Sequence, residues 1–150
     1  MGQHQVGAYA ERIRRELAPL SNPIEAMTTA VAALKEIPYY TWAGIYLLEG
    51  DELVLGPYLG KPSPHTRIPL GRGICGAAAA AKAPIVVDDV NSDPRYLACS
   101  SETKSEIVVP IMRGGVVLGE IDIDSDRPAA FTDDDRQLLE RVAAVLAEKL

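Results

Sequence analysis

The segment Ser105–Asp124 reads SEIVVPIMRGGVVLGEIDID, and it predicts a β-hairpin. Two runs rich in Val and Ile flank residues 113–115, and a glycine pair between such runs is typical of a tight turn. In a strand, successive side chains point to opposite faces, so Glu120, Asp122 and Asp124 share one face and the intervening residues share the other. The second strand of this hairpin is therefore apolar on one side and acidic on the other.

The rest of the chain predicts a second hairpin and helices at both ends. A turn at 49–51 separates two strand candidates, and Thr132 caps the final helix. Hairpins flanked by helices are typical of an α+β domain. The predicted elements are helices at 9–17, 23–37, 74–81 and 133–150, strands at 41–48, 52–59, 85–87, 105–112 and 116–124, and loops at 60–73 and 91–104.

Length and composition predict one globular domain over residues 1–150, with residues 1–8 flexible or partly ordered. Apolar residues make up 47% of the chain and charged residues 24%, which excludes a disordered protein. The formal net charge of -6 argues against nucleic-acid binding. No apolar run is long enough to cross a membrane and no secretory signal is visible, so we expect two reduced cysteines and a cytoplasmic location.

The acidic face has two interpretations. It is either a solvated surface or a negative pocket for a cation, which would be a metal ion or a substrate ammonium group. Glu106 begins the partner strand and is placed to join such a pocket. We expect no bound metal, because neither histidine lies near these acids in the sequence and no cluster has the spacing of metal ligands.

Residues 71–76 read GRGICG and match the dinucleotide-binding pattern G-x-G-x-x-G. A buried strand should lead into such glycines, whereas a proline-rich loop precedes them here, so a tight turn into a helix is the better interpretation. Cys75 would lie in the first turn of that helix, where the helix dipole and Arg72 favour a thiolate. Its Ala and Gly neighbours fit a buried structural thiol equally well.

Three further side chains are candidates for a site. Cys99 lies in a polar loop, where a reactive thiol is a fair alternative to a packing residue. Trp42 and Tyr46 fall on the same face of their predicted strand. They belong either to the core or to the wall of an apolar pocket beside the acids.

Taken together, these motifs resemble those of the free methionine-(R)-sulfoxide reductases, which are stand-alone GAF domains. The resemblance covers roughly residues 10–150, in order and with few gaps. It implies a GAF-like α+β domain with a central antiparallel β-sheet of five to six strands and with the N- and C-terminal helices packed on one side. The matching stretches are TWAGIYLL at 41–48, LVLGP at 53–57, GK at 60–61, RIP at 67–69, GRGICG at 71–76, AC at 98–99, SEIVVP at 105–110, GEIDIDS at 119–125 and FTDDD at 131–135.

The resemblance implies a redox reaction on a free amino acid. A thiolate attacks the sulfur of free methionine-(R)-sulfoxide while the oxygen is protonated, methionine leaves, and a cysteine sulfenic acid remains. A second thiol converts the sulfenic acid to a disulfide, which thioredoxin reduces with NADPH and thioredoxin reductase. No cofactor is bound. The family also implies a homodimer and a role in oxidative stress.

By the same resemblance, Cys99 matches the nucleophile. Glu106, Asp122 and Asp124 match acids that hold the substrate ammonium group and help to protonate the oxygen. Trp42 and Tyr46 match the aromatic wall around the methylthio end of the substrate.

One position departs from the family pattern, which has a third cysteine in the loop before residues 67–69. Here His65 stands at that position. Three outcomes stay open: Cys75 resolves Cys99, an external thiol reduces the sulfenic acid directly, or the domain has lost activity and is a non-catalytic GAF ligand-binding or regulatory module. If the enzyme is active, we expect a Cys75–Cys99 disulfide to form during turnover, because the sequence contains no other thiol. His65 would be a bystander or would help to hold Cys99 as a thiolate. Other thiol chemistry, or a metal-dependent enzyme, is a third reading.

Overall fold

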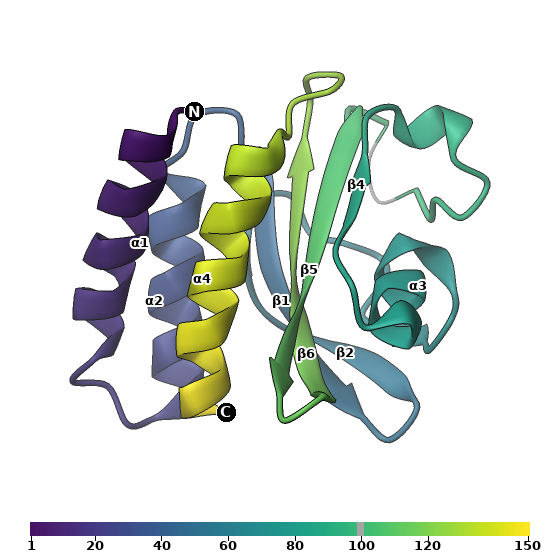
Figure 1. Ribbon diagram of the computed structural model, residues 1–150. Helices are drawn as coiled ribbons and strands as arrows, with labels where there is room; N and C mark the ends of the chain where they lie inside the picture. Colours follow the sequence, from purple (N-terminus) through teal and green to yellow (C-terminus); the bar gives the residue numbers. More distant parts are fainter. Residues whose placement is uncertain (99–100) are drawn as a thin grey trace.

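The computed structural model describes residues 1–98 and 101–150 (Figure 1). Its helices are α1 (Gln3–Leu17), α2 (Pro23–Lys35), α3 (Gly73–Ala81), the 3-10 turn η1 (Val90–Ser92) and α4 (Asp133–Lys149). Its strands are β1 (Trp42–Glu49), β2 (Glu52–Leu59), β3 (Arg67–Pro69), β4 (Ile85–Val87), β5 (Ser105–Arg113) and β6 (Val116–Ser125).

Within these described ranges, six antiparallel strands form one sheet in the order β3-β2-β1-β6-β5-β4. The helices α1, α2 and α4 cover one face, and α3 lies on the other face with the loop that follows β4 (Figure 1). The predicted α+β fold, with a sheet of five to six strands and the terminal helices on one side, is confirmed. The short strand β3 falls in a segment for which a loop was predicted.

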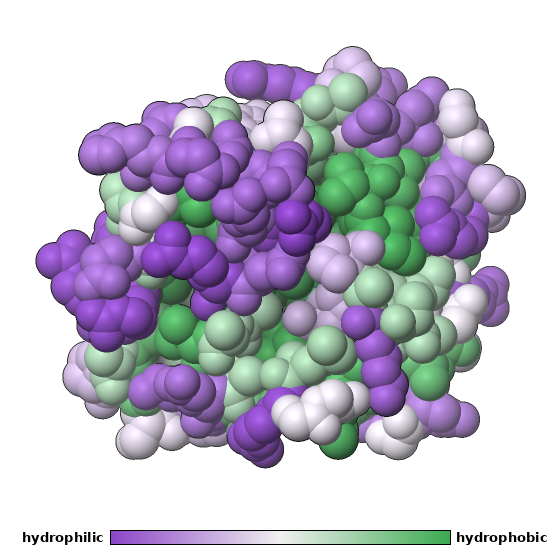
Figure 2. Space-filling view, viewed as in Figure 1, coloured by the Kyte–Doolittle hydropathy of each residue, from purple (hydrophilic) through white to green (hydrophobic). Residues whose placement is uncertain are grey.

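The main core lies between the sheet and the three helices. The residues that alternate with the acids in β6, Ile121 and Ile123, are fully buried against this layer, together with Ile107 of β5 and Leu139 of α4. Hydrophilic side chains lie over the outer surface of α1 on the face shown in Figure 2, as expected for the solvent side of an amphipathic helix. The alternation read from the sequence therefore sends one face of β6 into the core and the other toward α3.

The first helix begins earlier than the sequence predicted. Residues 1–8 were expected to be flexible or partly ordered, but α1 begins at Gln3 and Val6 is buried in the core. The apolar side of α1 thus extends one turn further toward the N-terminus. In the described part of the chain, no helix has the length and apolar character needed to cross a membrane.

The start of α4 is tied to the rest of the fold by the buried carboxylate of Asp135. Its Oδ1 accepts hydrogen bonds from the hydroxyl groups of Tyr39 at 2.6 Å and Tyr40 at 2.8 Å. Its Oδ2 accepts from the backbone N–H of Thr132 at 2.9 Å, which completes the cap of the helix. One side chain therefore fixes the α4 N-terminus against the segment that leads into β1.

Replacing Asp135 with alanine is expected to destabilise the domain by about 3 kcal/mol, because the buried hydroxyl of Tyr40, the half-buried hydroxyl of Tyr39 and a helix cap lose their acceptor. Urea unfolding followed by circular dichroism measures the change. Asp134→Ala is the matched control, since Asp134 is in the same helical turn and its side chain accepts an exposed hydrogen bond from Gln3. Equal stabilities for the two variants would contradict the role given to Asp135.

Candidate functional site

Four acidic side chains lie side by side on the sheet face that is turned toward α3. β6 carries Glu120, Asp122 and Asp124 at alternate positions, and β5 places Glu106 directly opposite Asp124. We call these four residues the acid cluster. All four are at most 5% exposed, so the interpretation of the acids as a solvated face is wrong.

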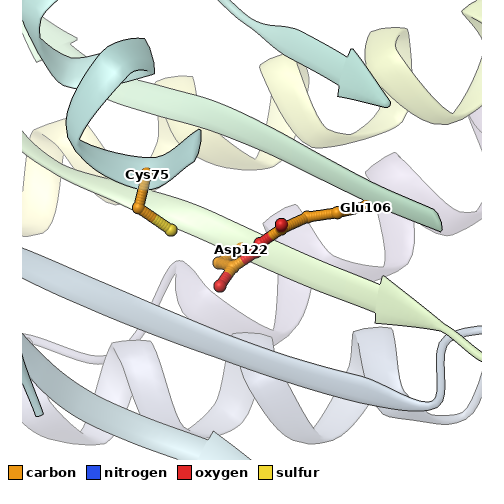
Figure 3. Close-up of side chains that lie close together, drawn as sticks. All are labelled: Cys75, Glu106 and Asp122. Atoms are coloured by element: carbon orange, nitrogen blue, oxygen red, sulfur yellow. The ribbon is translucent and has the colours of Figure 1, made fainter. Parts of the chain in front are cut away.

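Helix α3 covers the acid cluster from above. Gly73, the first residue of α3, has a φ of 68°. A Cβ at this position would come within 2.8 Å of Leu97, so glycine lets the loop that contains Leu97 pack closely onto the start of α3. The side chain of Cys75 points from this helix toward β6 and β5 (Figure 3). The Cys75 sulfur and one carboxylate oxygen each from Glu106 and Asp122 lie within 4.8 Å of one another.

Burial raises the pKa of every carboxyl group in the acid cluster, because desolvation penalises the charged form. The charge of Asp122 raises the pKa of Glu106, Glu120 and Asp124 further. Hydrogen bonds with Glu106 act in the opposite direction and lower the pKa of Asp122 and Asp124. Burial and the neighbouring charges therefore favour the protonated form of Glu106.

Cys75 is also driven toward its protonated form. Burial raises the pKa of the Cys75 thiol well above its usual value, and the charges of Asp122 and Glu120 raise it further. The expectation that the helix dipole gives Cys75 a low pKa is therefore wrong, because an acidic sheet face lies opposite the helix start. Cys75 matches the alternative interpretation, a buried thiol.

Several carboxylate oxygens of the cluster have no hydrogen-bond partner among the described residues. They are Oε1 and Oε2 of Glu120, Oδ1 of Asp122 and Oδ1 of Asp124. Buried polar atoms are normally paired, and each exception calls for an explanation. A cationic group with several N–H donors, such as an ammonium group, would satisfy these acceptors.

Trp42 forms an aromatic wall beside the acids. It pairs with Asp124 across β1 and β6, its ring stacks on Tyr58 with centroids 5.6 Å apart, and its Nε1–H donates to the Lys61 carbonyl at 2.9 Å. Gly44 leaves room for the indole, since a Cβ there would lie 2.4 Å from the ring. Tyr46 lies on the same side of β1 and is 1% exposed. The predicted shared face of Trp42 and Tyr46 is confirmed.

Gly44→Ala is expected to displace the Trp42 ring and to destabilise the domain by about 1–3 kcal/mol, the usual cost of overpacking. Trp42 is the single tryptophan of the chain, so its fluorescence reports the displacement directly. Gly7→Ala serves as the control, because a Cβ at that helical position meets nothing within 4 Å. It should be neutral or stabilise by up to ~1 kcal/mol. An unchanged emission spectrum and an unchanged stability in Gly44→Ala would contradict this prediction, because they would show that the Trp42 ring accommodates a Cβ at residue 44 without moving.

Two small cavities meet the acid cluster. One, of about 20 Å³, touches Glu106, Asp122, Cys75, Tyr46 and His65. The other, of about 60 Å³, lies between Trp42, Asp124 and the Lys61–Glu102 ion pair. A single water needs about 10–15 Å³ measured in this way, so the first cavity holds roughly one water and neither holds an amino acid.

Contacts between described residues join the loops that cover the acid cluster. The Nε2 of His65 donates to the carbonyl of Ala98 at 3.0 Å, and the Nζ of Lys61 donates to Glu102 at 2.6 Å. The hydroxyl of Tyr46 donates to the His65 carbonyl at 2.8 Å and so anchors the same loop to β1. His65 is thus placed beside the residue that precedes Cys99. The predicted nucleophile Cys99 itself lies outside the described residues.

The structure brings together all the other side chains that the sequence singled out: Cys75, Glu106, Asp122, Asp124, Trp42, Tyr46 and His65. Sequence reasoning missed Tyr58, which stacks on Trp42. A β-bulge between Gly44 and Tyr46 brings Tyr58 opposite Gly44, and the strand pattern carries no signal of that bulge.

The domain match and the relatives of this chain point to the same family. Residues 22–150 match the GAF domain. The free methionine-R-sulfoxide reductase of Escherichia coli is 40% identical over 134 residues, which span 89% of this chain and 77% of that protein.

Two solved structures are similar over almost the whole chain. The free methionine-R-sulfoxide reductase of Neisseria meningitidis in complex with its substrate has a TM-score of 0.91 at 36% identity, covering 97% of this chain and 89% of that one. The type II free methionine-R-sulfoxide reductase of Thermoplasma acidophilum has a TM-score of 0.80 at 39% identity, covering 94% of each chain. The chain belongs to the GAF domain family and, within it, to the free methionine-R-sulfoxide reductases.

Proposed function

We propose that this chain reduces free methionine-(R)-sulfoxide to methionine, with Cys99 as the nucleophile. The observation that carries the proposal is the acid cluster: four buried carboxyl groups, several of whose oxygens lack a hydrogen-bond partner among the described residues, beside an aromatic wall. A free amino acid carries an ammonium group that such a cluster would bind, whereas a methionine within a peptide lacks it. The named relatives support the same substrate.

In this scheme the residues of the acid cluster would have two roles, binding of the substrate ammonium group and donation of a proton. Asp122 and Asp124 each have an oxygen without a hydrogen-bond partner among the described residues, and these oxygens would accept hydrogen bonds from the substrate ammonium group. Burial and the neighbouring aspartates raise the pKa of Glu106, which favours its protonated form, so it would supply a proton to the sulfoxide oxygen. Trp42 and Tyr46 would enclose the methylthio end.

The chemical step would proceed on the sulfur of the substrate. The Cys99 thiolate attacks that sulfur, the S–O bond breaks as the oxygen is transferred and protonated, and methionine leaves. Cysteine sulfenic acid remains on Cys99, so the cysteine is oxidised by two electrons and the sulfoxide is reduced by two. A thiol then attacks the sulfenic sulfur, and water and a disulfide form.

We further propose that an external thiol, such as that of thioredoxin, completes the cycle directly. His65 cannot form a disulfide, and Cys75 is a poor resolving thiol because burial and neighbouring acids raise its pKa and lower its thiolate fraction. A Cys75–Cys99 disulfide is the competing route. Mass spectrometry after one equivalent of substrate separates them: a dimedone adduct on Cys99 supports the external route, and a peptide joined through Cys75 and Cys99 contradicts it.

The resolved R and S epimers of free methionine sulfoxide provide the test of function. We expect the R epimer to drive thioredoxin-dependent oxidation of NADPH and the S epimer to remain unused. Saturable binding of the R epimer without any turnover, even with dithiothreitol, would favour the non-catalytic GAF module instead. No binding of either epimer would refute the proposed substrate.

Two properties implied by the family resemblance stay predictions. A homodimer, with a contact through the terminal helices, is testable by light scattering after size-exclusion chromatography. A cytoplasmic location follows from the expectation of reduced thiols and is testable by fractionation of cells.

A further inference from the structure

The inward-facing side of α3 places a sulfur atom among carboxylates. Cys75 comes from α3, Glu106 from β5 and Asp122 from β6, and Figure 3 shows the thiol and the two carboxyl groups converging on one point. One donor atom from each lies within 4.8 Å of the other two. Sequence spacing does not predict the grouping of Cys75, Glu106 and Asp122, because the three residues come from separate elements and neither histidine belongs to the group.

A second observation points to a cation at this set. The Oδ1 atom of Asp122 is buried and has no hydrogen-bond partner in the described part of the chain. The neighbouring acid of β6, Glu120, is also fully buried, and its charge helps to raise the pKa of the Cys75 thiol. A cation bound to Cys75, Glu106 and Asp122 would offset the cost of burying these acids in their charged forms.

We propose that Cys75, Glu106 and Asp122 bind a divalent metal ion of intermediate softness, such as Zn²⁺. Zn²⁺ accepts thiolate sulfur at about 2.3 Å and carboxylate oxygen at about 2.0–2.2 Å. Ligands at these distances around a tetrahedral centre are roughly 3.5 Å apart, so the three side chains need to close by only about 1 Å. Ca²⁺ and Mg²⁺ require six or more oxygen ligands, and the thiol disfavours them.

Metal binding would regulate the reaction, a consequence that rests on the proposed function. Glu106 and Asp122 would serve both the metal ion and the substrate. The ion and the substrate ammonium group therefore compete for the same carboxylates. Zn²⁺ is expected to raise the apparent KM for methionine sulfoxide, and chelation should reverse the effect.

The binding test uses the Cys99→Ser variant of the full chain, in which Cys75 is the one remaining thiol. Co²⁺ is the probe, because a thiolate-to-Co²⁺ charge-transfer band reports sulfur ligation. We expect one equivalent of Co²⁺ to produce this band and Zn²⁺ to displace it. Cys75→Ser in the same background should abolish the band and weaken Zn²⁺ binding at least tenfold in calorimetry.

Two further variants keep this test decisive if Cys75→Ser unfolds. Asp122→Asn, which retains Cys75, should also weaken Zn²⁺ binding at least tenfold. Asp51→Asn removes one exposed carboxylate in the turn between β1 and β2 and should leave binding unchanged. Absence of the charge-transfer band, or equal affinity of the Asp122→Asn and Asp51→Asn variants, would overturn the proposed metal site.

Single-turnover assays without added thiol separate the two proposals. Metal-free protein that releases methionine and is unaffected by Zn²⁺ would overturn the regulation and leave the proposed function standing. Metal-free protein that binds Co²⁺ through Cys75 but never releases methionine would refute the proposed function and leave the metal site standing.

Discussion

Replacing Cys99 with serine is expected to abolish the release of methionine in a single turnover. The loss should be at least about a thousandfold, as is typical when a nucleophile is removed. Serine keeps nearly the same size but its hydroxyl does not attack the sulfoxide sulfur as a thiolate does. Methionine formed from one equivalent of the R epimer, measured by chromatography, reports the step without any reductant.

Cys75→Ser is the matched control for this experiment. It removes the buried thiol and leaves Cys99 in place, so it should release methionine in the first turnover. The opposite pattern, with Cys75→Ser inactive and folded and Cys99→Ser active, would move the nucleophile to Cys75.

Asp122→Asn is expected to lower kcat/KM for the substrate and to raise the stability of the metal-free protein. The variant should lose on the order of a hundredfold in kcat/KM for free methionine-(R)-sulfoxide, because truncating one partner of a buried charged hydrogen bond costs about 2–5 kcal/mol. At neutral pH the metal-free variant should also be more stable than the parent by ~1 kcal/mol, a rise in Tm of about 2–4 °C for a domain of this size. The neutral amide avoids the cost of a buried charge.

The pH dependence of this gain has a defined sign. Burial raises the pKa of Asp122 in the folded state above its unfolded value. The protonated group therefore favours folding below the unfolded pKa, and this advantage is lost as the pH rises through the folded pKa. The stability difference between the variant and the parent should be small in acid and grow toward neutral pH. Asp51→Asn, in an exposed turn, should show neither effect, and a parallel pH curve for Asp122→Asn would contradict the account.

The alternation of acids and apolar residues in β6 was enough to predict most of the site. It fixed which side chains face together, because the period of a strand is local and the paired strand β5 adds Glu106 in register. It did not show whether that face is solvated. Burial depends on α3 packing over the sheet, which is a tertiary contact between segments distant in the sequence. For the same reason the sequence could not decide between a thiolate and a buried thiol at Cys75, whose pKa is raised chiefly by burial and further by the acids opposite.

Tyr58 illustrates a second limit. The turn of the first hairpin pairs Glu49 with Glu52, and the same register continued would place Pro57 opposite Gly44. A β-bulge between Gly44 and Tyr46 shifts the register by one residue and brings Tyr58 there instead. The strand pattern does not indicate the bulge, so the stacking of Tyr58 on Trp42 could not be predicted from the sequence.

The most direct measurement is a competition among four substrates in one reaction: the R and S epimers of free methionine sulfoxide and of its N-acetyl derivative. Chiral chromatography follows each species as the protein turns over with a thiol reductant. Recognition of an ammonium group by the acid cluster predicts that free R epimer is consumed while the other three remain. Equal consumption of the N-acetylated R epimer would contradict the account, because that molecule has no ammonium group for the acids to bind.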